Sequence, residues 1–326
     1  MAIKNIVDQM TALEVARRSS SPDAFTIIET MAQSNTMLYE LPAMEANDGA
    51  VHTSLKRLSY PGGEHRMYNQ GVGKKSGQTV PQRDHITMLE AFSDVDVALA
   101  QHSGNPHALY NSEASAFLIG MGLDQAGEMI YGNNDNNPAE INGLARRYPK
   151  LGDHCVSFVE NPAGGEFTSA YLIAAGSNAC HMIYPKGSKS VGVSREDLGV
   201  LRVQDPNDAA KMLMVHSDHF KAEYGIVVAH PDAVIRICNI PLKLTPAQRV
   251  ELLELILRYQ KRLTKGVVNA VLFVNEDLLY QIERAGREAQ YVVHPETDPW
   301  GKPVSNINGL RIRQQDAILS AEEAVA

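Results

Sequence analysis

The strongest periodic pattern of apolar and polar positions lies in the middle of the chain, over residues 105–130, and predicts a long helix. Asn105 suits the N-cap and Pro106 suits the first helical position. About 25 residues at 1.5 Å each would make this helix roughly 37 Å long. Three glycines within it lower its intrinsic stability, so we expect its backbone to pack closely against a sheet; they are Gly120, Gly122 and Gly127.

Strand patterns lie on both sides of the predicted helix. Residues 84–101 alternate apolar and polar positions in places and carry β-branched residues. Residues 166–185 and 220–242 contain long apolar runs, which predict strands or hairpins. The pair Asn308-Gly309 stands between two short apolar runs and predicts a hairpin turn.

A second helical region begins after residue 244. Thr245 and Gln248 form the sequence of a capping box, with Pro246 at the first helical position, and the helix is expected to run through Arg262. Residues 267–275 predict a buried strand, and residues 276–286 predict another helix that is closed by its terminal glycine, Gly286. Helices and strands follow one another without a regular βαβ rhythm, so the pattern indicates an α+β protein.

Residues 1–50 have the pattern of an N-terminal arm. Residues 6–18 could form a helix, but a serine-rich segment ending in Pro22 interrupts the pattern. Residues 24–41 mix helical and extended signals, and their sequence does not decide between the two.

Residues 51–83 differ from the rest of the chain in charge and in hydrophobicity. They carry six basic residues against one acid, Glu64, which is about +5 in a chain of formal net charge −8 and leaves the remainder near −13 (−8 minus +5). A loop of this length with few large apolar residues is usually functional or disordered. Its basic residues either keep the loop soluble or meet an acidic surface of another copy; they are Lys56, Arg57, Arg66, Lys74, Lys75 and Arg83. The glycines expected to give it freedom are Gly62, Gly63, Gly71, Gly73 and Gly77.

The composition is that of a globular protein. The chain has 326 residues, of which 44% are hydrophobic and 21% charged, and its mean hydropathy is −0.22. No apolar run reaches the length of about 18 residues that a membrane span needs, so no membrane partner is expected. The three cysteines are far apart and set in apolar runs, which favours buried, reduced thiols. The mild net acidity argues against a dedicated nucleic-acid-binding protein.

Two motifs resemble ligand loops and fail on their spacing. The first motif, residues 71–77, resembles a Walker loop. The position five residues before Gly73, where that loop needs a glycine, is Tyr68, and Lys75 stands where it needs a hydroxyl. In residues 133–138, the turn glycine of a calcium loop is replaced by Pro138 and its bidentate glutamate by Leu144. A turn capped by Asn and Asp side chains fits the second motif better.

The histidines and cysteines match no known spacing for a metal site. His216 and His219 stand three residues apart on what the pattern predicts to be a loop, and Cys180-His181 has no partner pair. No nucleophile elbow occurs either. We therefore predict no catalytic residue, no cofactor and no metal site, and the chain is not expected to be an enzyme.

Residues 131–148, YGNNDNNPAEINGLARRY, directly follow the long predicted helix. This run resembles the helix-end signature of tailed-bacteriophage major capsid proteins with the Hong Kong 97-type fold. Residues 183–189, 223–237, 272–282 and 300–319 are similar to segments of the capsid proteins of short-tailed phages. The residues that carry the signature, in the turn that ends the spine helix, are Gly132, Asn137, Pro138 and Gly143.

The resemblance implies a division of the chain. It consists of an N-terminal arm (1–50), an extended loop laid over a neighbouring subunit (51–85), a peripheral domain with a long sheet and a spine helix at about 105–130 (86–242), an axial domain (243–320) and a tail (321–326). In the usual topology the segment like residues 223–237 closes the chain. Here it precedes the helix–strand–helix unit, which implies a rearranged connectivity.

The resemblance also implies a structural function. Such a protein self-assembles into pentamers and hexamers of an icosahedral shell around double-stranded DNA, which it contacts non-specifically. It would form in the host bacterial cytoplasm and remain in the virion. Expected partners are a separate scaffolding protein, a portal protein and, optionally, a cement or decoration protein. Two alternatives stay open: a cytoplasmic enzyme with a Gly/Lys-rich lid over a phosphorylated substrate, and an encapsulin-like protein compartment.

Overall fold

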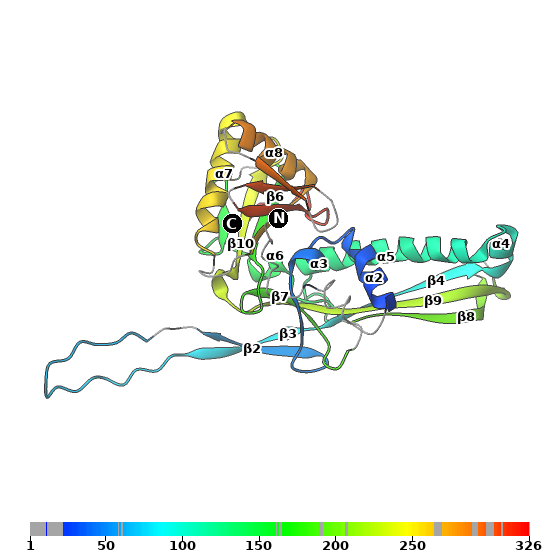
Figure 1. The fold of residues 1–326 in the computed structure, drawn as a ribbon, viewed down its shortest axis with the longest axis horizontal. Coiled ribbons are helices and arrows are strands. Elements are labelled where there is room, and N and C mark those ends of the chain that lie inside the picture. The colour runs from blue at the N-terminus through cyan, green and yellow to red at the C-terminus, as the bar shows by residue number, and fades with distance from the viewer. Residues whose placement is uncertain are drawn as a thin grey trace, which may run out of the picture.

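The computed structural model describes residues 11, 22–57, 59, 61–160, 162, 165–188, 192–205, 208–263, 269–288, 293–297, 303–307 and 309–325. The molecule has three parts (Figure 1). One sheet with two helices forms a compact body, a second sheet and a long helix extend from it to one side, and a hairpin projects to the other. The helix expected at residues 6–18 falls, apart from Thr11, outside the described residues. Among the described helices, none is long and apolar enough to cross a membrane.

The long helix is present where the sequence predicts it, as α5 (Pro106–Tyr131), and the Asn105 side chain accepts a hydrogen bond from the Ala108 amide at 3.2 Å. Gly122 allows a close approach, because a Cβ added there would lie 2.6 Å from the carbonyl oxygen of Met31. Met31 belongs to the helix α2 (Pro22–Ala32), so this contact is with a helix and not with the expected sheet. The ambiguous residues 24–41 form α2 and the short helix α3 (Met37–Glu40).

A five-stranded sheet lies along α5. Its order is β1 (Ala43–Glu45), β7 (Cys180–Tyr184), β9 (Asp208–Val228) and β4 (Thr87–Asp96), and β8 (Val193–Asp205) also pairs with β9. The expected loop around His216 and His219 is instead part of β9, so that expectation is wrong. Most residues of its partner β8 are exposed, and a strand that faces water carries no apolar pattern by which the sequence could reveal it.

A seven-stranded sheet forms the body. Its order is β12 (Val293–Thr297), β13 (Pro303–Ile307), β14 (Leu310–Gln314), β11 (Ala270–Val274), β6 (Phe167–Ala174), β10 (Val234–Pro241) and β5 (Cys155–Ser157). The helices α7 (Pro246–Gln260) and α8 (Glu276–Glu288) pack on it (Figure 1). The predicted capping box at Thr245 and the hairpin turn at Gly309, where φ is +78°, are both confirmed. Gly286 does not end α8 but lies buried within it.

The expected peripheral domain (86–242) was to contain one long sheet beside the helix, but its strands belong to two sheets. The chain leaves the seven-stranded sheet after β6, builds β7, β8 and β9 of the other sheet, and returns as β10. β10 pairs antiparallel with β6, and Val234 stands opposite Ile173. The apolar runs predicted the strands correctly, but a strand pattern does not specify which strand it pairs with.

The remaining elements connect these layers. The projecting hairpin consists of β2 (Val51–Arg57) and β3 (Thr79–His85), and the short helices are α4 (Val97–His102), α6 (Leu144–Arg147) and the 3₁₀ turn η1 (Pro231–Ala233). One hydrophobic core runs through both sheets and the inner half of α5. The two sheets therefore share buried side chains instead of meeting at a polar boundary.

Candidate functional site: the projecting hairpin and its root

The hairpin is a two-stranded ladder that carries a long loop at its end (Figure 1). Its strands pair antiparallel from Val51 opposite His85 to Arg57 opposite Thr79. Every residue described between 61 and 80 is exposed. The chain turns back near Asn69, whose φ of 63° is in the left-handed region that Asn tolerates. The hairpin thus makes almost no contact with the rest of its own subunit beyond its root.

The basic residues of the hairpin differ in their surroundings. Lys75 forms a 2.6 Å ion pair with Glu64, and this bond together with the Gly73 amide lowers the pKa of the Glu64 carboxyl. Arg66 donates to the carbonyl of Gln70 at 3.1 Å. The others that the structure describes are the exposed Lys74 and Arg83 and the half-buried Lys56, while the side chain of Arg57 lies outside the described residues.

The loop glycines have open surroundings. A Cβ added at Gly62, Gly63 or Gly71 would meet nothing within 4 Å, and at Gly73 it would meet only the Glu64 carboxylate at 3.7 Å. At Gly77 it would make ordinary contacts of 3.4 Å. None of the five has a left-handed φ. Nothing described around them requires glycine, and their role as hinges stays a prediction.

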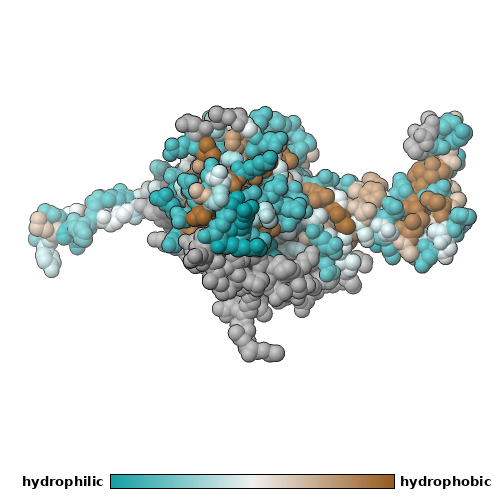
Figure 2. Space-filling view, turned by 90° about the horizontal axis from the view of Figure 1, so that it is seen from above, coloured by the Kyte–Doolittle hydropathy of each residue, from teal (hydrophilic) through white to brown (hydrophobic). Residues whose placement is uncertain are grey.

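The hairpin also exposes apolar side chains. The exposed fraction of the residue is 100% at Tyr68 and 72% at both Leu55 and Met67. Tyr68 and Met67 are neighbours at the turn of the hairpin, so a partner could cover both together, whereas Leu55 stands apart in β2. Figure 2 shows further apolar surface at the far end of the five-stranded sheet, where the exposed residues are Leu99, Val200, Leu201, Met212 and Met214.

A buried ion pair holds the root of the hairpin. Asp84 in β3 is 4% exposed and accepts a 2.7 Å hydrogen bond from Nη2 of Arg147 in α6. The same guanidinium donates to the carbonyls of Ile226 at 3.0 Å and Asn142 at 2.9 Å. Gln82 donates to both oxygens of Asp84 at 3.2 and 3.1 Å. The direction of the hairpin is therefore set by α6 and β9 together.

Two histidines pack beside this pair. His52 in β2 lies edge-on to His181 in β7, with 6.0 Å between the ring centroids. Burial, and then the neighbouring His52, lower the pKa of His181 to about 4. His181 is therefore a neutral side chain under the hairpin at neutral pH.

The turn after α5 leads directly to Arg147. A Cβ on Gly132 would lie 2.5 Å from the Glu128 carbonyl oxygen, and one on Gly143 would lie 2.7 Å from the backbone nitrogen of Gly132. The Gly143 amide donates to the Gly132 carbonyl at 2.9 Å, which closes the turn. Both glycines are thus required by close backbone contact.

Polar side chains stabilise the interior of that turn, as its composition predicts. Asn133 and Asn137 accept hydrogen bonds from the amides two residues further on, at 3.1 and 3.2 Å. Pro138 accepts from the side chain of Asn134 at 3.1 Å. Glu128 accepts from the Ile141 amide at 2.8 Å and from the Tyr224 hydroxyl at 2.5 Å, which ties the turn to β9. Burial, followed by Glu128, raises the pKa of Tyr224.

Residues 322–325, in the segment expected to be a tail, contact the body of the molecule. Glu322 is 6% exposed and pairs with Arg236 of β10 at 2.9 Å. It also accepts hydrogen bonds from Tyr131 at the end of α5 and from Ser169 of β6. Val325 exchanges two hydrogen bonds with Asn239, at 2.8 and 2.9 Å. Residues 322–325 therefore connect the seven-stranded sheet with α5.

The structure brings together two motifs that the sequence had singled out separately. The turn after the long helix and the basic hairpin meet through Arg147 and Asp84, and sequence reasoning named neither residue as part of a site. Arg147 follows Arg146, whose ion pair with Asp135 is exposed, and the sequence alone does not distinguish the two arginines. The available signal was a pair of arginines four residues or fewer after Gly143, and it was not specific.

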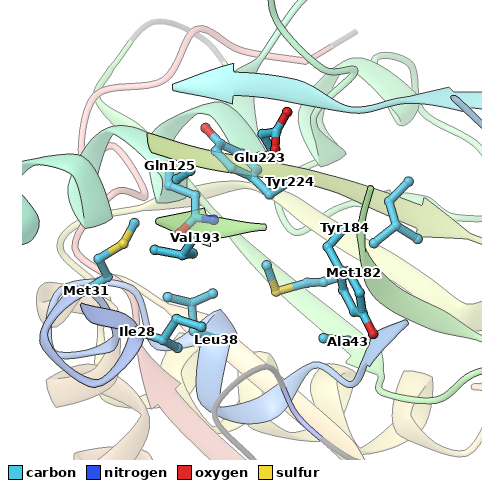
Figure 3. A pocket seen from close by; sticks show the side chains of 12 residues that line it. Ile28, Met31, Leu38, Ala43, Gln125, Met182, Tyr184, Val193, Glu223 and Tyr224 are labelled. Carbon is cyan, nitrogen blue, oxygen red and sulfur yellow. The ribbon is translucent and has the colours of Figure 1, made fainter. Parts of the chain in front are cut away.

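A small cavity lies between α2 and the five-stranded sheet (Figure 3). Ile28, Met31, Met182 and Tyr224 are among its lining residues, and its volume of about 20 Å³ is room for about one water molecule. None of the lining residues comes from the hairpin. The cavity is therefore far too small for a metabolite and does not lie under the glycine-rich loop.

Solved structures similar to this chain include capsid proteins of bacteriophages and an encapsulin. The capsid protein of bacteriophage Epsilon15 is 24% identical, with a TM-score of 0.63, over 100% of this chain and 99% of that one. The capsid of bacteriophage JBD30 has 10% identity and a TM-score of 0.46 over 96% and 99% of the chains. The SrpI encapsulin of Synechococcus elongatus has 11% identity and a TM-score of 0.43 over 64% and 88%. The long helix, two sheets and projecting hairpin define a Hong Kong 97-type capsid fold.

The family is shown by the sequence. The family model "Major capsid protein GP7" matches residues 20–326, and the chain belongs to this family. No curated protein sequence matched the chain. The protein is therefore a structural component of a phage capsid, as the helix-end signature implied, and it associates with itself to form a shell.

Proposed function

We propose that this capsid protein assembles into pentamers and hexamers of an icosahedral head around double-stranded DNA, and that the hairpin of each copy lies on a neighbouring copy. The observation that carries the proposal is the exposure of the hairpin, whose residues 61–80 are uncovered in the subunit and include a fully exposed Tyr68. A second copy supplies the surface to cover them. The net charge outside the hairpin, near −13 (−8 minus +5), complements its basic residues.

The two sheets would correspond to the two domains of a capsid subunit. In this proposal the five-stranded sheet and α5 are the peripheral domain, and the seven-stranded sheet with α7 and α8 is the axial domain around the five- and six-fold axes. This assignment follows the sheets and replaces a boundary at residue 242. Repeated heterologous contacts close into rings, and several modest contacts per subunit combine through effective concentration. The apolar end of the five-stranded sheet offers a second such contact surface.

Further partners belong to the same proposal. A separate scaffolding protein would guide assembly in the host bacterial cytoplasm, a portal protein would occupy one vertex, and a cement or decoration protein is an optional addition. DNA would be contacted weakly and non-specifically, because a formal net charge of −8 does not favour tight binding to phosphates.

The test is a deletion of the loop. Removing residues 62–77 should leave a folded subunit, judged by circular dichroism, that forms no stable shells in electron microscopy. A matched variant in which the same residues are replaced by a Gly/Ser chain of equal length separates the role of length from that of the side chains. Closed shells formed by the deletion variant would refute the role of the hairpin.

The two alternatives predict different particles. An enzyme with a glycine-rich lid would elute as a small oligomer, and the cavity of about 20 Å³ beside α2 is too small for a phosphorylated substrate. An encapsulin-like compartment would form shells that contain protein. Analysis of purified shells for nucleic acid and for protein cargo distinguishes this compartment from a phage head.

A further inference from the structure

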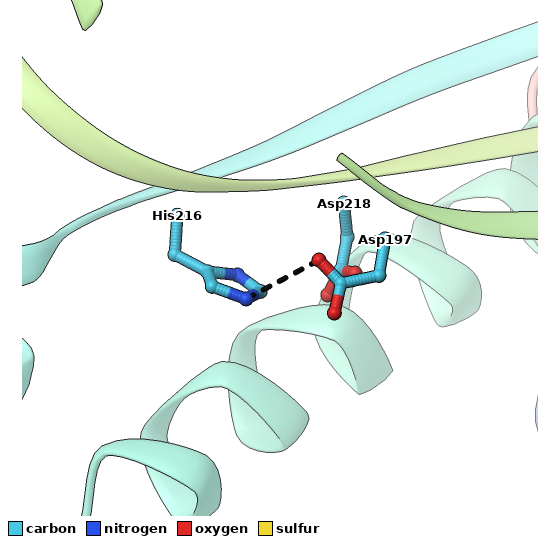
Figure 4. A group of neighbouring side chains, drawn as sticks. All are labelled: Asp197, His216 and Asp218. Carbon is cyan, nitrogen blue, oxygen red and sulfur yellow. Dashed lines mark ion pairs between the residues drawn. The ribbon is translucent and has the colours of Figure 1, made fainter. Parts of the chain in front are cut away.

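Three side chains converge on the β8–β9 strand pair, Asp197, His216 and Asp218 (Figure 4). Their potential ligand atoms all lie within 4.8 Å of one another. The register explains this, because Asp197 stands directly opposite Asp218, and His216 precedes Asp218 by two residues on the same face of β9. Figure 4 shows the imidazole and both carboxylates on the side of the strands that faces a helix.

The first two groups already have the separation of two metal ligands. Nε2 of His216 lies 3.3 Å from Oδ1 of Asp197. With bonds of about 2.0–2.2 Å to zinc, two ligands at the tetrahedral angle are roughly 3.4 Å apart. The same Asp197 oxygen accepts a 2.8 Å hydrogen bond from the Gly199 amide, at a bulge where the strand register shifts. That bond fixes the carboxylate toward the histidine.

The third group has an oxygen without a partner. Asp218 is 2% exposed, and its Oδ2 accepts a 2.8 Å hydrogen bond from Arg195. Its Oδ1 is buried and has no hydrogen-bond partner in the described part of the chain. A buried carboxylate oxygen left in this way is unfavourable, and a cation placed between the three side chains would satisfy it.

Charge and orientation also suit a cation. Two carboxylates and the one guanidinium of Arg195 leave the group with a charge of about −1 when the imidazole is neutral. The ring of Tyr110 in α5 stacks on His216, with 4.2 Å between centroids and 12° between planes, and holds the imidazole in place. One imidazole with two carboxylates suits zinc and similar transition-metal dications better than calcium or magnesium, which prefer oxygen alone.

We propose that Asp197, His216 and Asp218 bind a divalent transition-metal cation, for which Zn²⁺ is the best match, with water completing the coordination. The site lies outside the hairpin and its root and does not depend on the proposed arrangement of subunits. A bound cation would join the exposed strand β8 to β9 and, through Tyr110, to α5. It would thereby stiffen the half of the five-stranded sheet that is farthest from the body.

The test uses full-length protein, freed of metal with a chelator and titrated with Zn²⁺ against a chromophoric competitor. We expect one tightly bound equivalent per chain, lost in Asp218→Asn and in His216→Ala. The loss should exceed roughly 100-fold in affinity, because outer partners of metal ligands alone account for roughly 10–100-fold. Anomalous scattering or density at the site in the zinc-loaded protein locates the ion.

Two further variants make the outcome decisive. Asp197→Asn changes a side chain that is 65% exposed, so it removes a ligand without disturbing the fold. His219 lies on the opposite face of β9, with its Nε2 atom 3.6 Å from Oε2 of Glu90. The variant His219→Ala should therefore still bind one Zn²⁺ per chain. Equal zinc binding by the wild type, Asp197→Asn and Asp218→Asn would overturn the proposal. So would a wild-type protein that retains no zinc against the competitor.

Discussion

Arg147 in α6 and Asp84 in β3 form a buried ion pair with 2.7 Å between Nη2 and Oδ1, and it joins the turn after the long helix to the root of the hairpin. The side chains are 15% and 4% exposed. A pair so well shielded from water differs from the surface pairs of the same turn, because loss of one partner leaves the other charge without compensation.

Replacing Arg147 with Ala should therefore destabilise the free subunit by about 3–5 kcal/mol, measured by urea unfolding. The matched control is Arg146→Ala, whose pair with Asp135 is exposed and should be worth less than about 1 kcal/mol. A loss of stability of the same size in both variants would contradict the structural role of Arg147. Electron microscopy of shells from the Arg147 variant should also show poorly ordered hairpins.

Replacing Gly120 or Gly122 of the long helix with alanine should have opposite effects on stability. A Cβ on Gly122 would meet the Met31 carbonyl at 2.6 Å, whereas one on Gly120 would meet nothing within 4 Å. Gly122→Ala should lower the free energy of unfolding by about 1–3 kcal/mol, because it overpacks the contact with α2. Gly120→Ala should raise it by about 0.5–1 kcal/mol. Thermal or urea unfolding of the two variants measures both changes. If the free energy of unfolding changed in the same direction in both, the close packing of α2 on Gly122 would be contradicted.

Acid should weaken the subunit through His181. Its pKa is lowered to about 4 in the folded protein, by burial and then by His52, from a usual value of 6.5. The unfolded chain therefore takes up a proton at a higher pH than the folded one, so stability is lost as the pH falls from about 6.5 toward 4. Full loss of this contribution would be at most about 3 kcal/mol.

The measurement for His181 is the urea midpoint at about pH 7 and about pH 5. His181→Leu should show a smaller drop between the two than the wild type does. His102→Leu changes an exposed histidine at the end of α4 and should leave the drop unchanged. Asp84 and Arg147 act on the same region, so both should be kept intact in this series. A drop in His181→Leu as large as that of the wild type would assign the acid sensitivity to other groups.

Two adjacent lysines distinguish charge from backbone contact in the hairpin. Lys75 is neutralised by Glu64, while Lys74 has no ion-pair partner among the described residues. If charge attraction holds the hairpin on its neighbour, Lys74→Ala should raise the subunit concentration needed for assembly about 2–5-fold and reduce its salt dependence. Lys75→Ala should change the subunit concentration needed for assembly, and its salt dependence, less than Lys74→Ala does. Light scattering at several salt concentrations measures both, and identical curves for the two variants would favour backbone pairing.

Local signals in the sequence predicted local structure well. Asn105 with Pro106, Thr245 with Gln248, and Gly309 each begin or end the element that the pattern indicated, since caps and turns depend on neighbouring residues only. Pairing between distant strands was not predictable. The sequence indicated strands in residues 166–185 and 220–242 but placed them in one sheet, because apolar runs do not name their partners.

The hairpin shows the same contrast between local features, which the sequence predicts, and long-range contacts, which it does not. Its position and exposure could be predicted from charge and from the scarcity of apolar residues. The residues that anchor it could not, because Asp84 and Arg147 lie 63 positions apart and each has an equally charged or polar neighbour. The convergence of Asp197 with His216 was hidden for the same reason, since it depends on a register between β8 and β9 that no local pattern shows.

The pairing of β6 with β10 has a consequence for which insertions and deletions such a shell protein can tolerate. Ile173 and Val234 face each other across this ladder, so the intervening chain departs from and returns to the body at adjacent points. Additions or deletions after Asp205, where β8 leads into β9, would lengthen or shorten the two strands in step, because they pair along their length. The seven-stranded sheet keeps its register through any such change. The length of β8 and β9 can therefore be altered independently of the seven-stranded sheet.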